Sequence, residues 1–351
     1  MTPASIPVEV GELTADWFSH VFDQDVADAT VIDQSTGTTG RARVALRGDR
    51  NLPASVFVKL PPFDERQRAL VDMTGMGVSE ARFYRDLASE VPVLVPRVWF
   101  AATEADRYVM VLEDLVATGC RFPEPSDADI ADRARDIVDQ LASLHSHYWL
   151  SARFADGGDL AWLVERGAQS GDGGNSFIRR AVDAIGDQMD DEFHRVAALY
   201  LARSADISQL WRTGPATLVH GDSHLGNLFV PTRGMIRTGF LDWAVVCRAP
   251  GIRDVAYTMC NSVPPDIRAA IERGLVDRYC ELLDASGITF DSDDAWDQYR
   301  VHAVYSWVAA AATAGMGSKW QSIEVGLGGT RRATAACAHL DSVGLLESIL
   351  G

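Results

Sequence analysis

The sequence predicts an α+β protein with a β-rich N-terminal lobe and a mostly α-helical C-terminal lobe. Short apolar runs of β type gather in the first third of the chain, at residues 30–33, 42–46, 55–60 and 108–112. Helical spacing dominates residues 175–210 and 265–350. A length of 351 residues fits two domains. We place their boundary between residues 114 and 115, which gives lobes at 1–114 and 115–351.

The first two runs flank a glycine-rich segment, STGTTG at residues 35–40. Glycine and serine at this density indicate a turn, so the two runs should form a hairpin. The segment lacks the full G-x-G-x-x-G pattern of nucleotide-binding loops. By itself it therefore indicates only the hairpin.

The third run, residues 55–60, contains Lys59, one of only two lysines in a chain with thirty arginines; the other is Lys319. After it, residues 65–88 have helical spacing that is interrupted near Gly75. We therefore expect a strand that carries Lys59, followed by two helical pieces, the second of which carries Glu80.

Residues 108–115 form an apolar strand that runs into a polar connector, as expected for a hinge between lobes. A loop-like stretch follows at 120–128. Residues 129–149 then carry one apolar stripe, which predicts a core helix of the larger lobe: Ile137, Leu141, Leu144 and Tyr148.

The most informative stretch is HGDSHLGN at residues 220–227, followed by LDW at 241–243. Asp222 and Asn227 stand five positions apart, the spacing of the Asp and Asn in the kinase catalytic loop H-R-D-x-x-x-x-N. Asp242 lies where the Asp of the D-F-G triplet would follow. Phosphoryl transfer needs a base that orients the attacking hydroxyl and oxygen ligands for Mg²⁺, and these three residues can supply both.

Two short apolar runs, 228–230 and 239–241, separate this motif from Asp242. The segment PTRG at 231–234 lies between them, so a β-hairpin is expected that returns Asp242 to the side of Asn227. The competing interpretation is that Gly, Asp and Asn serve here only as turn formers.

The motif H-G-D-x-x-x-x-N resembles that of the aminoglycoside phosphotransferase and choline-kinase-like superfamily of small-molecule kinases. The ecdysteroid-kinase-like (CHK kinase-like) branch looks nearest, because a further aspartate, Asp254, follows Asp242 by about a dozen positions. The resemblance implies a bilobal protein-kinase-like fold, with ATP and Mg²⁺ as cofactors. It also implies Asp222 as the catalytic residue and Asn227 and Asp242 as metal ligands. At a helix start, Asp254 could cap its own backbone and hold the catalytic loop.

Lys59 and Glu80 extend the resemblance into the first lobe. The sequence SVFVKL at 55–60 is similar to the V-A-I-K strand of kinases, whose lysine contacts the α- and β-phosphates. Glu80, twenty-one residues later, is the candidate partner that holds this lysine in place. The alternatives are a solvated edge-strand lysine and a surface glutamate.

The glycine-rich turn and the hinge complete the nucleotide site that the resemblance implies. The turn ends nineteen residues before Lys59, so Gly37, Thr38 and Gly40 can lay backbone N–H groups over phosphates. Arg41 and Arg43 either reach phosphate or, more simply, are solvated strand positions. By resemblance, backbone groups near Glu113 and Leu115 bind the adenine edge, and a mutation of the Glu113 or Asp114 side chain could be quiet.

The alternation of His220, Asp222 and His224 also fits a metal-binding H-x-D-x-H pattern. The remaining histidines form no second cluster at ligand spacing, and His145 and His147 point to different faces of their helix. This hypothesis is therefore the weaker one.

Composition restricts the partners. A net charge of −17 argues against nucleic acid, because phosphate backbones require basic surfaces. Five cysteines, odd in number and without a C-x-x-C pair, indicate reduced thiols buried in the core of a cytoplasmic protein. No run reaches the roughly 18 residues of a membrane helix, so we expect no membrane partner. No feature of the sequence indicates an oligomeric state.

Aromatic residues of the C-terminal lobe are candidates for an acceptor-binding wall, since their faces suit sugars, sterols and cations. Most should lie in the core, and Trp243, fixed beside Asp242, is the strongest candidate. The others are Trp162, Trp211, Trp296, Trp307 and Trp320.

The sequence thus predicts a kinase that moves the γ-phosphoryl group of ATP to a hydroxyl of a small molecule. The acceptor classes left open are sugars, amino sugars, aminoglycosides, choline-like alcohols and sterols. A protein acceptor is disfavoured by the lack of H-R-D and A-P-E elements. The alternative function is that of a nucleotide-binding regulatory pseudokinase without turnover.

Overall fold

The chain folds into two compact units in the computed structural model, which describes residues 6–164, 172–234, 237–316 and 323–351. The first unit comprises residues up to 121 together with 229–245, and the second comprises 122–228 and 246–351. The first unit thus includes the segment around Asp242, although this segment comes much later in the sequence than the rest of the unit. The division of function at residues 114 and 115 stays a proposal.

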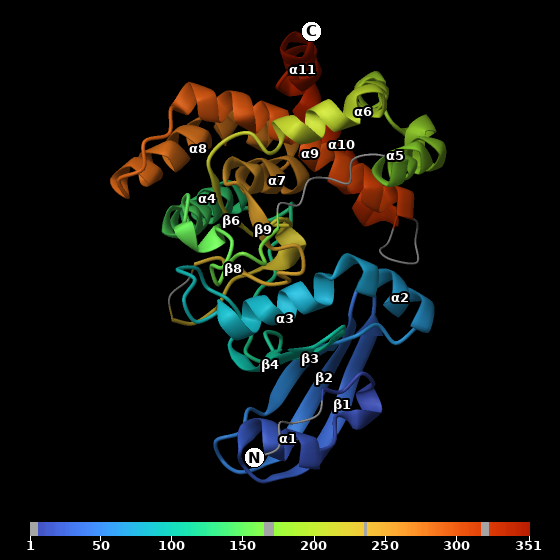
Figure 1. Ribbon diagram of the computed structural model, residues 1–351, viewed down its shortest axis with the longest axis vertical. Coiled ribbons are helices and arrows are strands. Elements are labelled where there is room, and N and C mark those ends of the chain that lie inside the picture. Colours follow the sequence, from blue (N-terminus) through green and yellow to red (C-terminus); the bar gives the residue numbers. More distant parts are fainter. Residues whose placement is uncertain (1–5, 165–171, 235–236, 317–322) are drawn as a thin grey trace. The chain divides into compact units, whose positions relative to one another are not determined.

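The first unit is built on an antiparallel sheet with the strand order β1-β2-β3-β5-β4 (Figure 1). Its elements are η1 (Val10–Glu12), α1 (Ala15–Phe22), β1 (Val26–Thr36), β2 (Gly40–Gly48), β3 (Ser55–Leu60), α2 (Glu65–Thr74), α3 (Met76–Asp86), β4 (Val98–Glu104) and β5 (Arg107–Glu113). The predicted hairpin, the Lys59 strand and the pair of helical pieces are all present. Helix α1 and strand β4 were not predicted from the sequence.

Side-chain alternation gives this sheet two different faces. Ala42, Val44 and Val58 point into a core that also contains Trp17 and Phe18 of α1. The intervening residues of β2 and β3, Lys59 among them, must point to the opposite face, because successive side chains of a strand alternate. Helix α3 packs against β4 and β5.

A left-handed residue separates the two helices that precede β4. Gly75 has φ +64° between α2 and α3, a conformation that glycine adopts without steric cost. The predicted interruption of the helical pattern is therefore real, and it allows α3 to begin in a new direction with Glu80 on its second turn.

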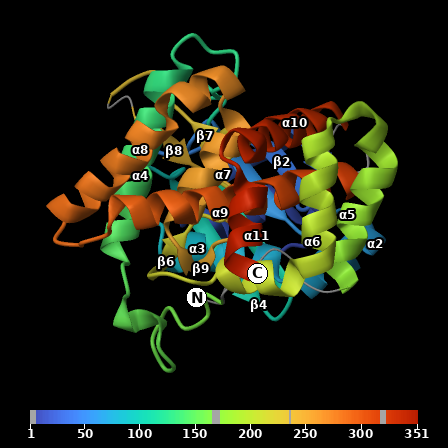
Figure 2. The same cartoon turned by 90° about the horizontal axis from the view of Figure 1, so that it is seen from above.

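The second unit is mostly helical. Its elements are α4 (Ile130–His147), η2 (Ala152–Phe154), α5 (Asp172–Ile185), η3 (Gly186–Gln188), α6 (Asp191–Leu210), β6 (Ala216–Val219), η4 (Leu225–Asn227), β9 (Cys247–Pro250), α7 (Ile252–Ser262), α8 (Pro265–Ala285), α9 (Ser292–Met316), α10 (Ile323–His339) and α11 (Ser342–Leu350). Helix α9 contacts α5, α7 and α10 (Figure 2). The predicted stripe of α4 is fully buried.

Two short strand pairs position the motif residues. Strands β6 and β9 are antiparallel and were not predicted, whereas the predicted hairpin is present as β7 (Leu228–Phe229) and β8 (Gly239–Phe240). The segment 220–227 follows β6 directly. Helix α7 follows β9, and all of its residues are buried.

The free cysteines are consistent with reduced core thiols. Cys247, Cys260, Cys280 and Cys337 are buried, whereas Cys120 is half-buried. Within the described ranges, no helix is both long and apolar enough to cross a membrane.

Substitution of Gly77 in α3 tests whether the stability of the protein depends on the close packing of this helix against the sheet. A Cβ at this position would lie 2.1 Å from the Tyr108 ring. Gly77→Ala should therefore lower the free energy of unfolding by about 1–3 kcal/mol, despite the gain of about 1 kcal/mol in helix propensity. Chemical denaturation measures the change.

Gly274→Ala is the matched control, because a Cβ on this glycine of α8 meets no atom within 4 Å. It should raise the free energy of unfolding by up to about 1 kcal/mol. Equal effects of the two substitutions would contradict the packing of α3 described above.

Candidate functional site

Two acidic side chains of the first unit lie beside Lys59. Its Nζ lies 2.6 Å from Oε1 of Glu80 and 3.2 Å from Oδ1 of Asp242. The lysine and glutamate side chains are 5% and 0% exposed, respectively. The structure thus brings the predicted lysine and glutamate together, excludes the two surface alternatives, and adds Asp242 to the pair.

Burial dominates the protonation of Glu80. Desolvation raises the pKa of Glu80 to about 7, and the attraction of Lys59 offsets only part of that rise. The second oxygen of the carboxyl group, Oε2, is buried without a hydrogen-bond partner among the described residues. A buried carboxylate with one unpaired oxygen is costly, which explains the direction of the shift.

Helix α3 also fixes the segment around Asp242. The Phe83 ring stacks on Trp243 at 3.9 Å between centroids, and the Tyr84 hydroxyl accepts a hydrogen bond from the Asp242 backbone. Asp242 itself has φ +62°, a left-handed conformation that aspartate tolerates better than most residues. One helix therefore supplies the partner of Lys59 and holds the aspartate that lies beside it.

Trp243 is not part of an acceptor wall, contrary to the prediction from sequence. Its side chain is fully buried, because Phe83 covers one face of the ring. Trp211 and Trp307 are also fully buried, as expected for core residues. Trp320 and Lys319 lie outside the described residues.

The glycine-rich turn joins β1 to β2. Gly37 and Thr38 lie in the turn itself, and a Cβ on Gly37 would meet no atom within 4 Å. Gly40 is different, because a Cβ there would lie 2.4 Å from the Phe63 ring and 2.6 Å from the carbonyl oxygen of Pro61. Packing within the unit therefore requires a glycine at position 40.

Asp114 organises the segment that the sequence predicts to be the hinge. Arg43 donates to both carboxylate oxygens at 3.0–3.2 Å, and the Ser55 hydroxyl donates to Oδ2 at 2.6 Å. Asp114 is only 2% exposed, and although burial opposes ionisation, these donors hold its pKa below the ordinary value. Both expectations for this pair were wrong: Arg43 is not a solvated strand residue, and a mutation of Asp114 should not be quiet.

The residues flanking Asp114 differ in their backbone hydrogen bonds. The N–H of Glu113 donates to Arg97, whose own N–H donates to the Glu113 carboxylate. The carbonyl of Leu115 accepts from Cys120. The Leu115 N–H has no partner among the residues that the structure describes. This donor is therefore not used by the described part of the chain.

Asp254 organises the segment 220–227 in the second unit. Its carboxylate accepts from the backbone N–H of His220 at 2.6 Å and of Gly221 at 2.9 Å. His145 lies 3.4 Å from the same carboxylate and also contacts the Tyr279 hydroxyl at 2.9 Å. Burial raises the pKa of Asp254, but the contact with His145 and the N–H donors outweigh it and lower the pKa. The predicted support of the loop is present, but the predicted cap of its own helix is not.

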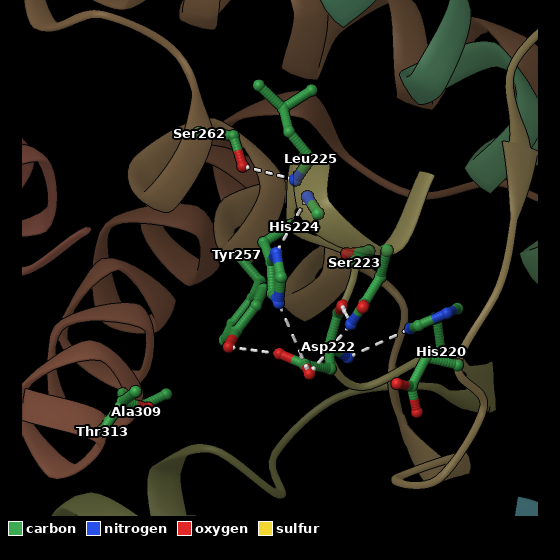
Figure 3. Close-up of polar contacts among 12 residues, drawn as sticks. His220, Asp222, Ser223, His224, Leu225, Tyr257, Ser262, Ala309 and Thr313 are labelled. Carbon is green, nitrogen blue, oxygen red and sulfur yellow. Dashed lines mark hydrogen bonds and ion pairs between the residues drawn. The ribbon is translucent and has the colours of Figure 1, made fainter. Parts of the chain in front are cut away.

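Asp222 supplies the carboxylate of this segment, and it is half-buried. Tyr257 of α7 donates its hydroxyl to Oδ1 at 2.6 Å (Figure 3). The Asn227 amide donates to Oδ2 at 3.0 Å. The Asp222 side chain remains 34% exposed. Burial and the adjacent carboxylate raise the pKa of Tyr257 well above its ordinary value, so the hydroxyl stays a donor. The carboxylate is thus held in one orientation while still accessible from solvent.

Asn227 has an oxygen that is available for a cation. Its Nδ2 group donates to both the backbone carbonyl and the carboxylate of Asp222, which fixes the orientation of the amide. Its Oδ1 accepts no hydrogen bond from a described residue. An amide oxygen of this kind is a ligand that Mg²⁺ accepts, so the residue fits the predicted role.

The two histidines of the segment contact its backbone, and His224 Nε2 also lies 3.7 Å from Oδ2 of Asp222. His220 Nδ1 accepts the N–H of Asp222 at 3.2 Å, and His224 Nδ1 accepts the N–H of Gly226 at 3.0 Å. Within the described ranges, no group of three His, Cys, Asp or Glu side chains is arranged to hold a metal ion. The H-x-D-x-H interpretation therefore has no structural support.

Sequence reasoning missed three residues that hold the loop or its aspartate: His145, Tyr257 and Tyr279. A spacing argument could have found Tyr257, because it stands three positions after Asp254 and therefore shares a face of α7. His145 and Tyr279 carry no such signal, since α4 and α8 meet only in the folded chain.

Residues 39–302 match the model of the phosphotransferase enzyme family, APH. No curated protein sequence matches the chain.

Several solved structures share the fold at low sequence identity. A candidate aminoglycoside phosphotransferase from Ralstonia eutropha JMP134 is 14% identical, with a TM-score of 0.56, over 93% of this chain and 97% of that one. The GDP complex of aminoglycoside 2'-phosphotransferase-IIIa is 13% identical, with a TM-score of 0.53, over 88% and 93%. Choline kinase from Cryptosporidium parvum Iowa II is 8% identical, with a TM-score of 0.50, over 92% and 90%. The predicted bilobal kinase-like fold is confirmed.

Glu80 should make the stability of the protein depend on pH. Folding raises the pKa of this group from 4.5 to about 7, so between these values the folded chain holds a proton that the unfolded chain releases. The contribution of Glu80 to stability therefore falls as pH rises through this window. The melting temperature of the wild type minus that of Glu80→Gln should therefore be larger at pH 5 than at pH 8.

Thermal unfolding of both proteins across this pH range measures the difference. Glu281→Gln, at an exposed position of α8, should leave the pH dependence of the wild type unchanged. Parallel curves for wild type and Glu80→Gln would show that the burial of this carboxyl group does not control its protonation.

Proposed function

The chain belongs to the phosphotransferase enzyme family, and from this premise we propose that it transfers the γ-phosphoryl group of ATP to a hydroxyl of a small molecule. The observation that carries the proposal is the state of Asp222. This carboxylate is partly accessible and is oriented by two hydrogen bonds. It belongs to a loop whose backbone N–H groups donate to the buried carboxylate of Asp254. Such a group can orient an acceptor hydroxyl and take its proton.

Mg²⁺ is the metal proposed for this reaction. The Asn227 amide oxygen and the Asp242 carboxylate would hold it, and when bound it would neutralise charge on the transferred phosphoryl group. Lys59 would bind the α- and β-phosphates, with Glu80 keeping its ammonium group in place. The Asn227 oxygen, which accepts no hydrogen bond from a described residue, and the buried Lys59–Glu80 pair support these assignments.

ATP is the nucleotide proposed. The N–H of Leu115 supports an adenine site at the hinge, because it is a donor without a partner in the described structure. The turn with Gly37 and Thr38 would cover the phosphates. Residues 1–114 would then act as the nucleotide-binding lobe and 115–351 as the catalytic and acceptor-binding lobe.

The acceptor is proposed at the level of chemical class. The structures that share the fold include proteins named as kinases of aminoglycosides and of choline. Membership of the ecdysteroid-kinase-like branch remains a prediction, and with it a sterol-like acceptor. A sugar, an amino sugar or a choline-like alcohol fits the same chemistry.

Asp222→Asn tests the proposal. We expect wild type to release ADP from ATP in the presence of Mg²⁺ and one acceptor from a panel of aminoglycosides, amino sugars, sugars, choline-like alcohols and sterols. The variant should lose about 10²–10⁴-fold in kcat, because the base is removed while its hydrogen-bonded neighbours remain. A coupled assay for ADP measures both proteins.

Asp284→Asn is the control, since this exposed aspartate of α8 makes no side-chain hydrogen bond to a described residue. It should retain full activity. If wild type binds ATP but no acceptor gives turnover above the Asp222→Asn background, a regulatory nucleotide-binding protein becomes the better interpretation.

Tyr257→Phe tests how Asp222 is positioned. The substitution removes one hydrogen bond to a charged group while keeping the ring. A bond of this kind contributes about 1.5–3 kcal/mol, so kcat should fall about 10–100-fold. The KM for ATP should not change, because the tyrosine acts only on the carboxylate. Steady-state kinetics measures both constants.

Tyr299→Phe provides the comparison, because this buried tyrosine donates at 2.8 Å to the carboxylate of Glu272 in the same unit. It should lower stability but leave kcat unchanged. Equal losses of kcat in the two variants would contradict a specific role for Tyr257.

A further inference from the structure

Strand register places a second cation directly opposite Lys59. In the antiparallel pair of β2 and β3, Arg41 is the cross-strand partner of Lys59. Directly opposed residues of such a pair project to the same face of the sheet. This is the face away from the core around Val44 and Val58, on which Glu80 meets the lysine.

The two cations share one carboxylate. Lys59 Nζ lies 3.2 Å from Oδ1 of Asp242, and Arg41 Nη2 lies 3.8 Å from Oδ2. Like charges directly opposite each other on a sheet repel. The carboxylate of Asp242 therefore offsets a repulsion that the register itself creates.

The two cations are held to different degrees. Lys59 is buried and has Glu80 as a second partner, so it remains paired if Asp242 changes partner. Arg41 is 39% exposed, its contact with Asp242 is long, and it has no other side-chain partner among the described residues. The guanidinium group can therefore leave this carboxylate at little cost, since exposed ion pairs contribute little.

We propose that Arg41 is a second phosphate-binding cation of the nucleotide site, released from Asp242 when that carboxylate takes up Mg²⁺. The inference rests on the proposed function. A guanidinium group offers paired N–H donors that match phosphate oxygens. Arg43, two residues along the same face, cannot serve in this way, because Asp114 already holds it through both carboxylate oxygens.

The arrangement gives Asp242 two alternating sets of partners. Without nucleotide, its carboxylate neutralises Arg41 and Lys59. If Mg²⁺ occupied the carboxylate, Arg41 would require another anion, because Lys59 keeps Glu80, and a polyphosphate chain would supply several negative oxygens. Binding of the metal and of the phosphates should therefore favour each other.

Calorimetric binding of Mg·ATPγS, Mg·ADP and adenosine to wild type and Arg41→Gln tests the proposal. The variant should bind Mg·ATPγS about tenfold more weakly, the effect expected for losing one charge-assisted contact. It should bind adenosine as tightly as wild type does. Arg47→Gln, at an exposed position of the same strand, is the matched control and should bind all three ligands normally.

A second pair of variants examines the exchange of partners. Asp242→Asn should bind metal-free ATPγS more tightly than wild type, because the carboxylate no longer competes for Arg41. This gain should be smaller in the double variant Arg41→Gln/Asp242→Asn. A merely structural contact between Arg41 and Asp242 would not produce this pattern.

Two results would overturn the proposal while leaving the proposed function intact. One is that Arg41→Gln binds Mg·ATPγS as tightly as wild type. The other is that it loses the same factor for adenosine as for the triphosphate, which would mean a general disturbance of the lobe. Failure of the wild type to bind any of the three ligands would contradict both the inference and the proposed function.

Discussion

The buried ammonium group of Lys59 is the constraint on which the first unit depends. A cation that is 5% exposed is unfavourable unless anions surround it. Glu80 and Asp242 meet that need, and they come from α3 and from a segment more than a hundred residues further along the chain. The sheet, the helix and the Asp242 segment must therefore come together for the charge to be tolerated. We propose that the same cluster binds phosphate when the carboxylate exchanges its partners.

The second unit has a corresponding constraint at Asp254. A single buried carboxylate accepts two consecutive backbone N–H groups of the loop and contacts a buried histidine. Helix α7, which carries it, is buried along its length, so the loop is attached to the buried interior of the unit. Tyr257 extends from the same helix to Asp222. One buried helix thereby holds both the loop and the carboxylate that the proposed chemistry uses.

Much of this arrangement could be predicted from local sequence. The strand around Lys59, the divided helix with Glu80 and the hairpin before Asp242 each leave a pattern of apolar spacing and turn residues, and the interval between Asp222 and Asn227 identified their loop. The errors have a different origin. The burial of Trp243 depends on Phe83, and the pairing of Arg43 with Asp114 depends on the strand register. Such contacts join distant segments, and no periodicity reports them.

The most direct test of the account uses the scarcity of lysine in this chain. An ATP analogue with a reactive acyl group on its γ-phosphate acylates amines that lie beside bound phosphates, and the chain offers only Lys59, Lys319 and its N-terminal amine. Peptide mass spectrometry should find the label on Lys59, and excess Mg·ATP should prevent it. Labelling confined to the other two amines, or labelling of Lys59 that excess nucleotide does not reduce, would contradict a nucleotide site at this lysine.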